Sequence, residues 1–373
     1  MEMKAEQNNS RVYQTKLEIS LDAILHNLNA FRKLLAPETK IMAMVKASVY
    51  GLGDAKIVSF LKSHGVDYLA VACTDEGIDL CKSGVALPII VLNPEPSSFD
   101  MIIKYSLEPE LYSAELFDKF ISIAEKTGLT EYPVHIKIDS GMRRLGFLPD
   151  EIDELARKIK ETKRIRIVSV FSHLAGSDNP DLDSFTKNQV DVFLSACSKL
   201  HSAAGYPFMK HILNSSGIAR MPQYQFDMVR PGIGLYGAGT FDGITLKPAG
   251  RFISIISQIK TVKAGEPVGY ECADVAENDR EIAILPVGYA DGLRRKMGNK
   301  RGGLFIRGNR VTIVGNVCMD MCMADVTGIE AEVGDEAEIF GDNISINEVA
   351  EICETIPYEI LTSISGRVKR LFV

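Results

Sequence analysis

The chain has 373 residues, of which 46% are hydrophobic and 24% charged, and its formal net charge is −7. This length fits one large and one smaller domain, and the composition is ordinary for a soluble globular enzyme. The acidic balance argues against nucleic acid as the main partner. No apolar run reaches the roughly 18 residues that a membrane-spanning helix requires.

The amino terminus and the cysteines indicate in which cellular compartment the protein is expected. The first ten residues, MEMKAEQNNS, are polar and predict no secretory signal. The seven cysteines include one close pair, Cys318 and Cys322, but no second pair or histidine cluster completes a zinc site. We therefore expect no metal, thiols that fill the core in a reducing compartment, and a cytoplasmic protein.

From residue 40 onwards, short apolar or β-branched runs alternate mostly with helical segments. The runs are KIMAMVKA, YLAVAC, PIIVLN, LEPELY, VHIKID, IRIVSVFSH, MKHILNSS and MVRPGIGLYG. Eight strands separated by helices over about 200 residues predict an α/β fold, a (β/α)8 TIM-type barrel. A doubly wound open sheet is the alternative.

Start and stop signals delimit the helices between these runs. Asp54, Thr74 and Ser113 each precede an amphipathic segment and are expected to cap it. Glycines follow the predicted helix ends, at Gly65, Gly84, Gly128 and Gly205.

The pattern changes after about residue 245. Helical periodicity fades, and RFISIISQIKTV, REIAILPV, GGLFIRGNRVTIVGNV and DEAEIFG predict strands joined by Gly, Asn and Asp turns. We therefore predict a barrel over residues 11–245 and a smaller, mostly β C-terminal domain over 246–373.

In such a barrel, the residues that carry chemistry lie at the carboxyl ends of the strands. Polar side chains and glycines gather at these predicted ends. They are Lys46 and Tyr50; Lys137, Asp139, Arg143 and Arg144; His173; residues 214–217 (NSSG); and Arg230, Gly232 and Gly234. Each has an ordinary structural explanation when taken alone, such as an ion pair at the barrel rim. The prediction of a site depends on their occurring together at one face.

The last two groups predict a phosphate site. Loops after the seventh and eighth strands of these barrels commonly bind phosphate with hydroxyls and bare backbone N–H groups. Ser215, Ser216, Gly217, Gly232 and Ile233 supply both kinds of donor. A strand-end lysine opposite such a site suggests a phosphorylated aldehyde held as a Schiff base, of which pyridoxal phosphate is the common case.

At this point the motifs resemble a known family, the pyridoxal-phosphate-dependent alanine racemases. The stretch VKASVYGLG is similar to the family's lysine signature, usually written VKANAYGHG. The resemblance continues, in the family's order, through DSGMRRLGF, FSHLAGSD, LNSSG, VRPGIGLYG, GEPVGY, PVGYADG, VCMDMCMADV and PYEILTSIS. It covers nearly the whole chain from about residue 15 and implies a barrel plus a β domain.

The resemblance also implies a two-base mechanism. Lys46 would carry pyridoxal 5'-phosphate and act as one base, and Tyr270 would be the second base, contributed by the other subunit of a homodimer. Two bases that flank the aldimine meet the need of racemisation, which removes a proton from one face of Cα and returns it to the other. The cofactor-binding residues that the resemblance implies are Lys46, Tyr50, His173, Ser215, Arg230, Gly232 and Ile233.

Further residues are assigned by the same resemblance. Arg144 matches the arginine near the substrate carboxylate, and Met319, with Asp320 beside it, matches a carboxylate-side contact from the partner chain. Lys137 matches a lysine that is carbamylated in some members to hold that arginine.

The chain departs from the family pattern at three places. Gly366 stands where many members have a tyrosine that contacts the phosphate, Arg143 replaces a usual glycine, and Glu271 follows Tyr270 where glycine is common. None of these changes removes a catalytic residue, but they bear on substrate breadth.

The expected function is alanine racemase, an isomerase that supplies D-alanine for peptidoglycan of the cell wall. Three alternatives use the same barrel: a broad-specificity amino-acid racemase, a basic amino-acid decarboxylase and a non-catalytic pyridoxal phosphate carrier. The decarboxylases need a different second-domain signature, and the carriers resemble a lone barrel, so the motif PVGY at 267–270 and the β domain favour the racemase.

Overall fold

The computed structural model describes residues 14–53 and 55–373. The chain forms two compact units, which are described separately. The barrel unit is Leu21–Ala249, and the β unit joins the described residues up to Ser20 with Gly250–Val373. Within the described residues, no helix is long and apolar enough to cross a lipid bilayer.

The barrel unit contains all eight predicted strands. They are β2 (Lys40–Met44), β3 (Tyr68–Val71), β4 (Ile89–Val91), β5 (Glu108–Leu111), β6 (Tyr132–Lys137), β7 (Ile165–Phe171), β8 (Met209–His211) and β9 (Met228–Val229). Neighbouring strands are parallel, in the order β8-β7-β6-β5-β4-β3-β2-β9. Backbone N–H groups of Asp227 and Arg230 donate to the carbonyls of Lys210 and Leu213, at 3.1 and 3.0 Å. These bonds join the two end strands, so the sheet closes into a barrel and the open-sheet alternative is wrong.

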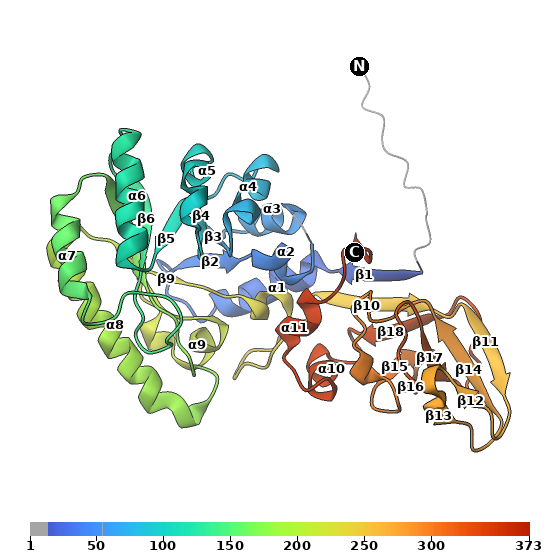
Figure 1. Cartoon of the computed structure of the whole chain (residues 1–373). Coiled ribbons are helices and arrows are strands. Elements are labelled where there is room, and N and C mark those ends of the chain that lie inside the picture. The colour runs from blue at the N-terminus through green and yellow to red at the C-terminus, as the bar shows by residue number, and fades with distance from the viewer. Residues whose placement is uncertain (1–13, 54) are drawn as a thin grey trace. The chain divides into compact units, whose positions relative to one another are not determined.

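Helices surround these strands (Figure 1). The α-helices are α1 (Leu21–Arg32), α2 (Lys46–Tyr50), α3 (Ala55–Ser63), α4 (Thr74–Lys82), α5 (Phe99–Lys104), α6 (Ala114–Lys126), α7 (Ile152–Glu161), α8 (Asp183–Ala204) and α9 (Ser215–Arg220). Short 3-10 turns are η1 (Pro96–Ser98), η2 (Pro180–Leu182), η3 (Pro222–Tyr224) and η4 (Ile233–Tyr236). The segment α2 is not a regular helix, because residues 47–50 have positive φ, and it belongs to the candidate site.

The predicted helix signals can be compared with the observed caps. Ser113 caps α6 as expected, because its hydroxyl accepts the Leu116 N–H at 3.2 Å. Gly205 ends α8 in the left-handed conformation, at φ 74°. The prediction that Thr74 caps α4 is wrong. Thr74 is the first residue of that helix, and its hydroxyl bonds to that of Ser98 at 2.7 Å. The predicted cap at Asp54 lies outside the described residues.

The β unit is built on a nine-stranded sheet, which confirms the mostly β character of the C-terminal part. Its order is β11-β14-β17-β16-β15-β18-β10-β1-β19. The strands are β1 (Thr15–Ile19), β10 (Gly250–Ile255), β11 (Gln258–Val262), β14 (Arg280–Leu285), β15 (Gly303–Ile306), β16 (Asn309–Val314), β17 (Cys322–Asp325), β18 (Glu336–Phe340) and β19 (Lys369–Phe372). Outside it lie the two-stranded sheet of β12 (Pro267–Val268) and β13 (Asp274–Val275), the helices α10 (Ile346–Ile352) and α11 (Pro357–Thr362), and the turns η5 (Tyr270–Cys272) and η6 (Arg295–Met297).

One predicted boundary needs correction. The prediction places residues 11–245 in the barrel, but β1 pairs antiparallel with β10 and parallel with β19, in the sheet of the β unit. Leu17 and Ile19 are fully buried in that sheet. An alternating run of five residues fits either unit equally well, so the sequence pattern alone does not assign it. At the other boundary, the units divide between Ala249 and Gly250, four residues beyond the predicted end at 245.

The cysteines correct a smaller expectation. All seven are free thiols, but Cys73 and Cys272 are exposed, so the thiols do not all fill the core.

Candidate active site

Lys46 lies directly after β2, at the carboxyl end of the barrel strand, as the sequence predicts. The next four residues, Ala47 to Tyr50, all have φ between 50° and 56°, so the chain makes one turn of left-handed helix before Gly51. Each non-glycine residue in this conformation costs roughly 1–2 kcal/mol. Such a run persists only where its surroundings hold it, and strained backbone of this kind concentrates at functional sites.

The surroundings of this turn provide anchors at both ends. The Glu76 carboxylate accepts the Ala47 N–H at 2.6 Å and the Ala72 N–H at 2.7 Å, which ties the turn to the end of β3. At the other end, the Val49 and Tyr50 side chains are buried. Lys46 itself is partly buried, and burial followed by the nearby Arg144 cation lowers its pKa. A lowered pKa makes more of the neutral amine available near pH 7.

Arg230 follows β9 and is only 4% exposed. Its Nη2 atom donates to the carbonyls of Ser172 and Ile212, at 2.6 and 3.1 Å, and to His173 Nδ1 at 3.3 Å. Its Nη1 atom donates to His211 Nδ1 at 2.6 Å. Burial lowers the pKa of Arg230 to about 10, which still leaves the guanidinium charged at neutral pH. Four acceptors therefore fix the orientation of a buried cation.

The bond to His211 continues across the barrel as a hydrogen-bonded chain, here called the Glu108–Arg230 chain. His211 Nε2 lies 2.8 Å from the Ser169 hydroxyl, which lies 2.7 Å from His135 Nδ1. His135 Nε2 lies 2.7 Å from the Glu108 carboxylate. Its five residues come from β5, β6, β7, β8 and the end of β9, in the order Glu108, His135, Ser169, His211 and Arg230.

Donor chemistry sets the direction of every proton in this chain. Arginine only donates, so His211 accepts at Nδ1 and carries its proton on Nε2. That proton points to Ser169, whose own hydroxyl then donates to His135, and His135 donates to Glu108. Burial and the adjacent Arg230 hold the pKa of His211 well below its usual value, as this neutral tautomer requires.

A cradle of buried polar atoms lies beside Arg230, formed by Tyr50, Ser215, Gly232 and Ile233. The Gly232 N–H donates to the Ser215 hydroxyl at 2.9 Å. A Cβ on Gly232 would come within 2.8 Å of the Tyr50 hydroxyl, so only glycine leaves that space open. The structure therefore brings together the residues that sequence reasoning assigned to a phosphate site.

A group of charged side chains completes the barrel site. Lys137, at the end of β6, is buried, and its Nζ lies 4.2 Å from the centre of the Phe171 ring. Arg144 is exposed, and among the described residues its guanidinium has no hydrogen-bond or ion-pair partner. The pKa of His173 lies well below its usual value. Burial is the main cause, and the nearby cations add to it, in the order Arg230, Lys137, Arg144 and Lys46.

The other predicted residues lie in the β unit. Tyr270 and Met319 are 70% and 53% exposed, unusually high for large apolar side chains. Asp320 accepts a hydrogen bond from Arg367 at 2.6 Å, and Arg367 also donates to Asp291 at 2.6 Å. The backbone around Tyr270 is held by Asn316, whose side-chain amide donates to the Tyr270 carbonyl at 3.1 Å.

Sequence reasoning missed four buried residues of the barrel site: Glu110, His135, Ser169 and His211. All four were visible as polar letters inside predicted strands, in LEPELY, VHIKID, IRIVSVFSH and MKHILNSS. A charged residue or a histidine in an otherwise buried strand is a signal that it has a partner or a role.

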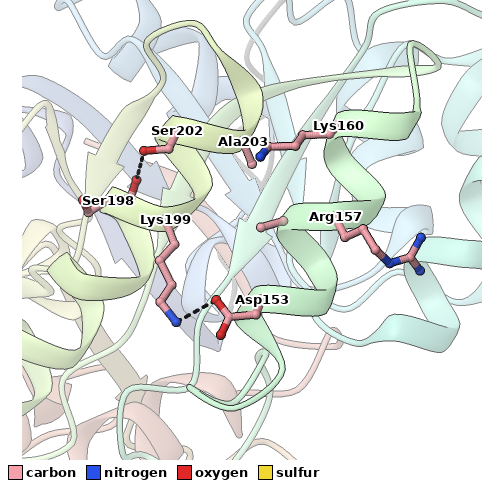
Figure 2. A pocket seen from close by; sticks show the side chains of 8 residues that line it. Asp153, Arg157, Lys160, Ser198, Lys199, Ser202 and Ala203 are labelled. Carbon is pink, nitrogen blue, oxygen red and sulfur yellow. Dashed lines mark hydrogen bonds and ion pairs between the residues drawn. The ribbon is translucent and has the colours of Figure 1, made fainter.

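Elsewhere on the barrel unit, an open hollow of about 450 Å³ lies between α7 and α8. Figure 2 shows its lining, which includes Asp153 paired with Lys199 at 2.7 Å and the Ser202 hydroxyl bonded to the Ser198 carbonyl. Its walls come from the outer helices and not from strand ends, so it is separate from the candidate active site.

Comparison with known families decides what this site belongs to. The family model described as alanine racemase, N-terminal domain, matches residues 19–240, and the model for the alanine racemase C-terminal domain matches residues 249–372. The chain belongs to the alanine racemase family. It is therefore an isomerase of the alanine racemase type, and the recognition and the fold class expected from the sequence are confirmed.

Individual relatives of this racemase agree over nearly their full lengths. Alanine racemase 1 of Caldanaerobacter subterraneus subsp. tengcongensis is 36% identical, with 97% of this chain and 95% of the relative covered. The structure of alanine racemase from Clostridium difficile 630 superimposes with a TM-score of 0.91 at 35% identity, covering 98% of this chain and 97% of that one. Alanine racemase from Bartonella henselae with covalently bound pyridoxal phosphate gives a TM-score of 0.89 at 30% identity, covering 97% and 100%.

Proposed function

We propose that this racemase interconverts L- and D-alanine with pyridoxal 5'-phosphate as its cofactor, and that Lys46 and Tyr270 are its two bases. One observation carries the cofactor assignment. The strand-end lysine, the glycine cradle and the buried Arg230 all occur at the carboxyl end of one barrel. The bound cofactor of the Bartonella henselae relative supports the same assignment.

The residues present fit this cofactor. Tyr50, Ser215, Gly232 and Ile233 would hold the phosphate, because a bare backbone beside two hydroxyls leaves room for an anion that a Cβ would fill. Pyridoxal phosphate, when bound, supplies an aldehyde that condenses with an amine and a conjugated ring that accepts electron density from the substrate Cα. His173 would lie beside that ring.

Arg230 would donate a hydrogen bond to the ring nitrogen of the cofactor. A guanidinium keeps its proton at neutral pH, even with the pKa lowered to about 10 by burial. Arg230 therefore donates a hydrogen bond but does not transfer a proton. We expect this to limit side reactions such as transamination, because protonation of the ring nitrogen would strengthen electron withdrawal from the substrate.

Proton transfer at the alanine Cα would use one base on each face. Lys46 would remove or return the proton on one face, and its lowered pKa keeps a larger share of the amine neutral for this role. Tyr270 would serve the other face. Arg144, whose guanidinium has no partner among the described residues, would bind the substrate carboxylate, with Met319 as a further contact.

We also propose a homodimer, in which Tyr270 of the partner subunit completes each site. The exposure of both Tyr270 and Met319 in a single chain supports this, because large apolar side chains that remain exposed commonly mark interfaces. Asp320, held by Arg367, would support the position of Met319. We place the enzyme in the cytoplasm, where it would supply D-alanine for peptidoglycan.

The decisive experiment follows exchange and inversion together. The purified protein is incubated with pyridoxal phosphate and L-alanine in D2O, while optical rotation and Cα deuteration are recorded. We expect rotation to decay to zero as deuterium enters. Absence of both changes with alanine, but their presence with another amino acid, would show a racemase of different specificity, and absence with every amino acid would contradict the proposal.

Two variants separate the roles of the bases. Tyr270→Phe keeps the ring but removes the hydroxyl, so we expect deuterium exchange on one enantiomer to persist while loss of rotation slows by at least about 100-fold. Lys46→Ala should abolish both. If Tyr270→Phe inverts alanine as fast as the wild type, Tyr270 is not the second base.

A further inference from the structure

Glu110 is a buried carboxylate that the proposed mechanism does not use. It lies on β5, is only 1% exposed, and its Oε1 atom is 4.0 Å from Lys137 Nζ. Among the described residues it has no closer polar side-chain partner. A carboxylate rarely stays this deeply buried without opposing charges, so its surroundings explain its presence.

Those surroundings are strongly cationic. Lys137, Arg230, Arg144 and Lys46 all lie near enough to Glu110 to lower its pKa, in that order of strength. Asp139, the other buried acid beside Lys137, already accepts the N–H groups of Gly141 and Arg143, at 2.9 and 3.0 Å. Glu110 is thus the buried carboxylate that opposes the charge of these four cations, here called the cation group.

Glu110 and Lys137 form a buried ion pair, with 4.0 Å between Oε1 and Nζ. Burial raises the pKa of Glu110, which the Lys137 cation opposes, and burial lowers the pKa of Lys137, which the Glu110 carboxylate opposes. Each charge thus opposes the effect of burial on the other, and the Glu110 carboxylate favours the ammonium form of Lys137.

We propose that Glu110 is the built-in anion of this cation group and keeps Lys137 as an unmodified ammonium ion, so that Lys137 is not carbamylated in this enzyme. Carbamylation requires the neutral amine: R–NH2 + CO2 gives R–NH–COO⁻ and one released proton. The Glu110 carboxylate favours the ammonium ion and so reduces the share of neutral amine that CO2 can attack. A carbamate would also place a second anion beside the Glu110 carboxylate in a buried site, where like charges repel strongly.

The packing around Lys137 supports this assignment. The Phe171 ring lies under the ammonium at 4.2 Å, a cation–π contact that favours the charged form and that an anionic carbamate would lose. Arg230 also lies over this ring, at 5.3 Å. The inference builds on the proposed roles of Lys137 and Arg144, but whether Lys137 is modified can be measured without any racemase activity.

The test uses ¹³C NMR of the full-length protein in ¹³C-bicarbonate at pH 7.5, with Lys137→Met to identify any carbamate resonance that belongs to Lys137. We expect no such resonance in the wild type. Glu110→Gln removes the anion and should produce one, and its activity should rise at least about threefold on addition of bicarbonate while wild-type activity stays unchanged. Glu110→Met, which keeps the side-chain volume, replaces Glu110→Gln if that variant does not fold.

Glu108→Gln is the matched control, because Glu108 lies two residues away on the same strand but bonds to His135 instead. It should show no carbamate. A Lys137 carbamate in the wild type would overturn the proposal. Its absence from both the wild type and the Glu110 variants would show that Glu110 is not what prevents modification. Loss of racemisation without change in these spectra would contradict only the proposed function.

Discussion

The Glu108–Arg230 chain makes a quantitative prediction for Ser169→Ala. The Ser169 hydroxyl accepts from His211 Nε2 at 2.8 Å and donates to His135 Nδ1 at 2.7 Å, and all three side chains are fully buried. Its removal leaves two ring nitrogens without partners. Each such group costs about 1–3 kcal/mol, so we expect the free energy of unfolding to fall by about 3 kcal/mol. For a chain of 373 residues, with an unfolding entropy of about 2.1 cal/mol/K per residue, that lowers Tm by about 4 °C.

The assay has two parts, both made without cofactor. Thermal unfolding followed by circular dichroism gives the change in Tm, and ¹⁵N NMR of the imidazoles gives the His211 tautomer. We expect the Nε2 proton of His211 to lose its hydrogen-bonded shift, while Nδ1 remains the acceptor from Arg230. Ser172→Ala is the control: this serine is also buried, but its hydroxyl donates to the Ile138 carbonyl at 2.7 Å, accepts from the Ser140 hydroxyl at 2.8 Å, and lies outside the chain.

The two serines should therefore differ in kind. Ser172→Ala removes two hydrogen bonds and should lower stability by about 2 kcal/mol, but it should leave the His211 signals unchanged. If Ser169→Ala changes stability by less than about 1 kcal/mol and leaves His211 unaffected, the five residues do not form a continuous chain and the proton directions derived from Arg230 are wrong.

Three further predictions test separate parts of the site. Gly232→Ala should weaken pyridoxal phosphate binding at least about tenfold by equilibrium dialysis, because its Cβ meets the Tyr50 hydroxyl at 2.8 Å, and equal losses in the wild-type and Tyr50→Phe backgrounds would exclude that contact as the cause. The raised Glu110 pKa, about 7 against 4.5, stabilises the fold below pH 4.5, and this contribution is lost as pH rises through 7. Urea unfolding should therefore show wild-type stability falling relative to Glu110→Gln between pH 5 and about 8, and parallel curves would refute the shift. Ala47→Gly should raise stability by about 0.5–1 kcal/mol, whereas Ala156→Gly in α7 should lower it by about 1; a loss at both positions would contradict the left-handed turn.

Much of the fold follows from the sequence because its signals are local. Each barrel strand is a short apolar or β-branched run, and each intervening helix carries its own amphipathic stripe. Position at the carboxyl end of a strand then predicted the placement of Lys46, His173 and Arg230 without knowledge of tertiary contacts. The strand β1 was assigned to the wrong unit, because its pairing partners lie more than 200 residues away.

The roles assigned to Tyr270 and Met319 remain predictions. Nothing local to PVGY or VCMDM implies a base or a carboxylate contact, and those roles came from the family resemblance. What the structure adds is that both side chains are exposed in the β unit, on backbone that Asn316 and the Asp320–Arg367 pair hold in place.

The interior of the barrel is the part that sequence patterns represent least well. A polar residue on a strand looks the same whether it faces water or the barrel axis, and only the register of three neighbouring strands brings Ser169 between two histidines. Glu110 illustrates the consequence. Read along LEPELY it is one of two glutamates in a short strand, but in space Glu108 terminates a hydrogen-bonded chain while Glu110 faces the cations. Two residues of the same type, two positions apart, thus contact different parts of the site, and that difference is why Glu108→Gln serves as the control for the Glu110 variants.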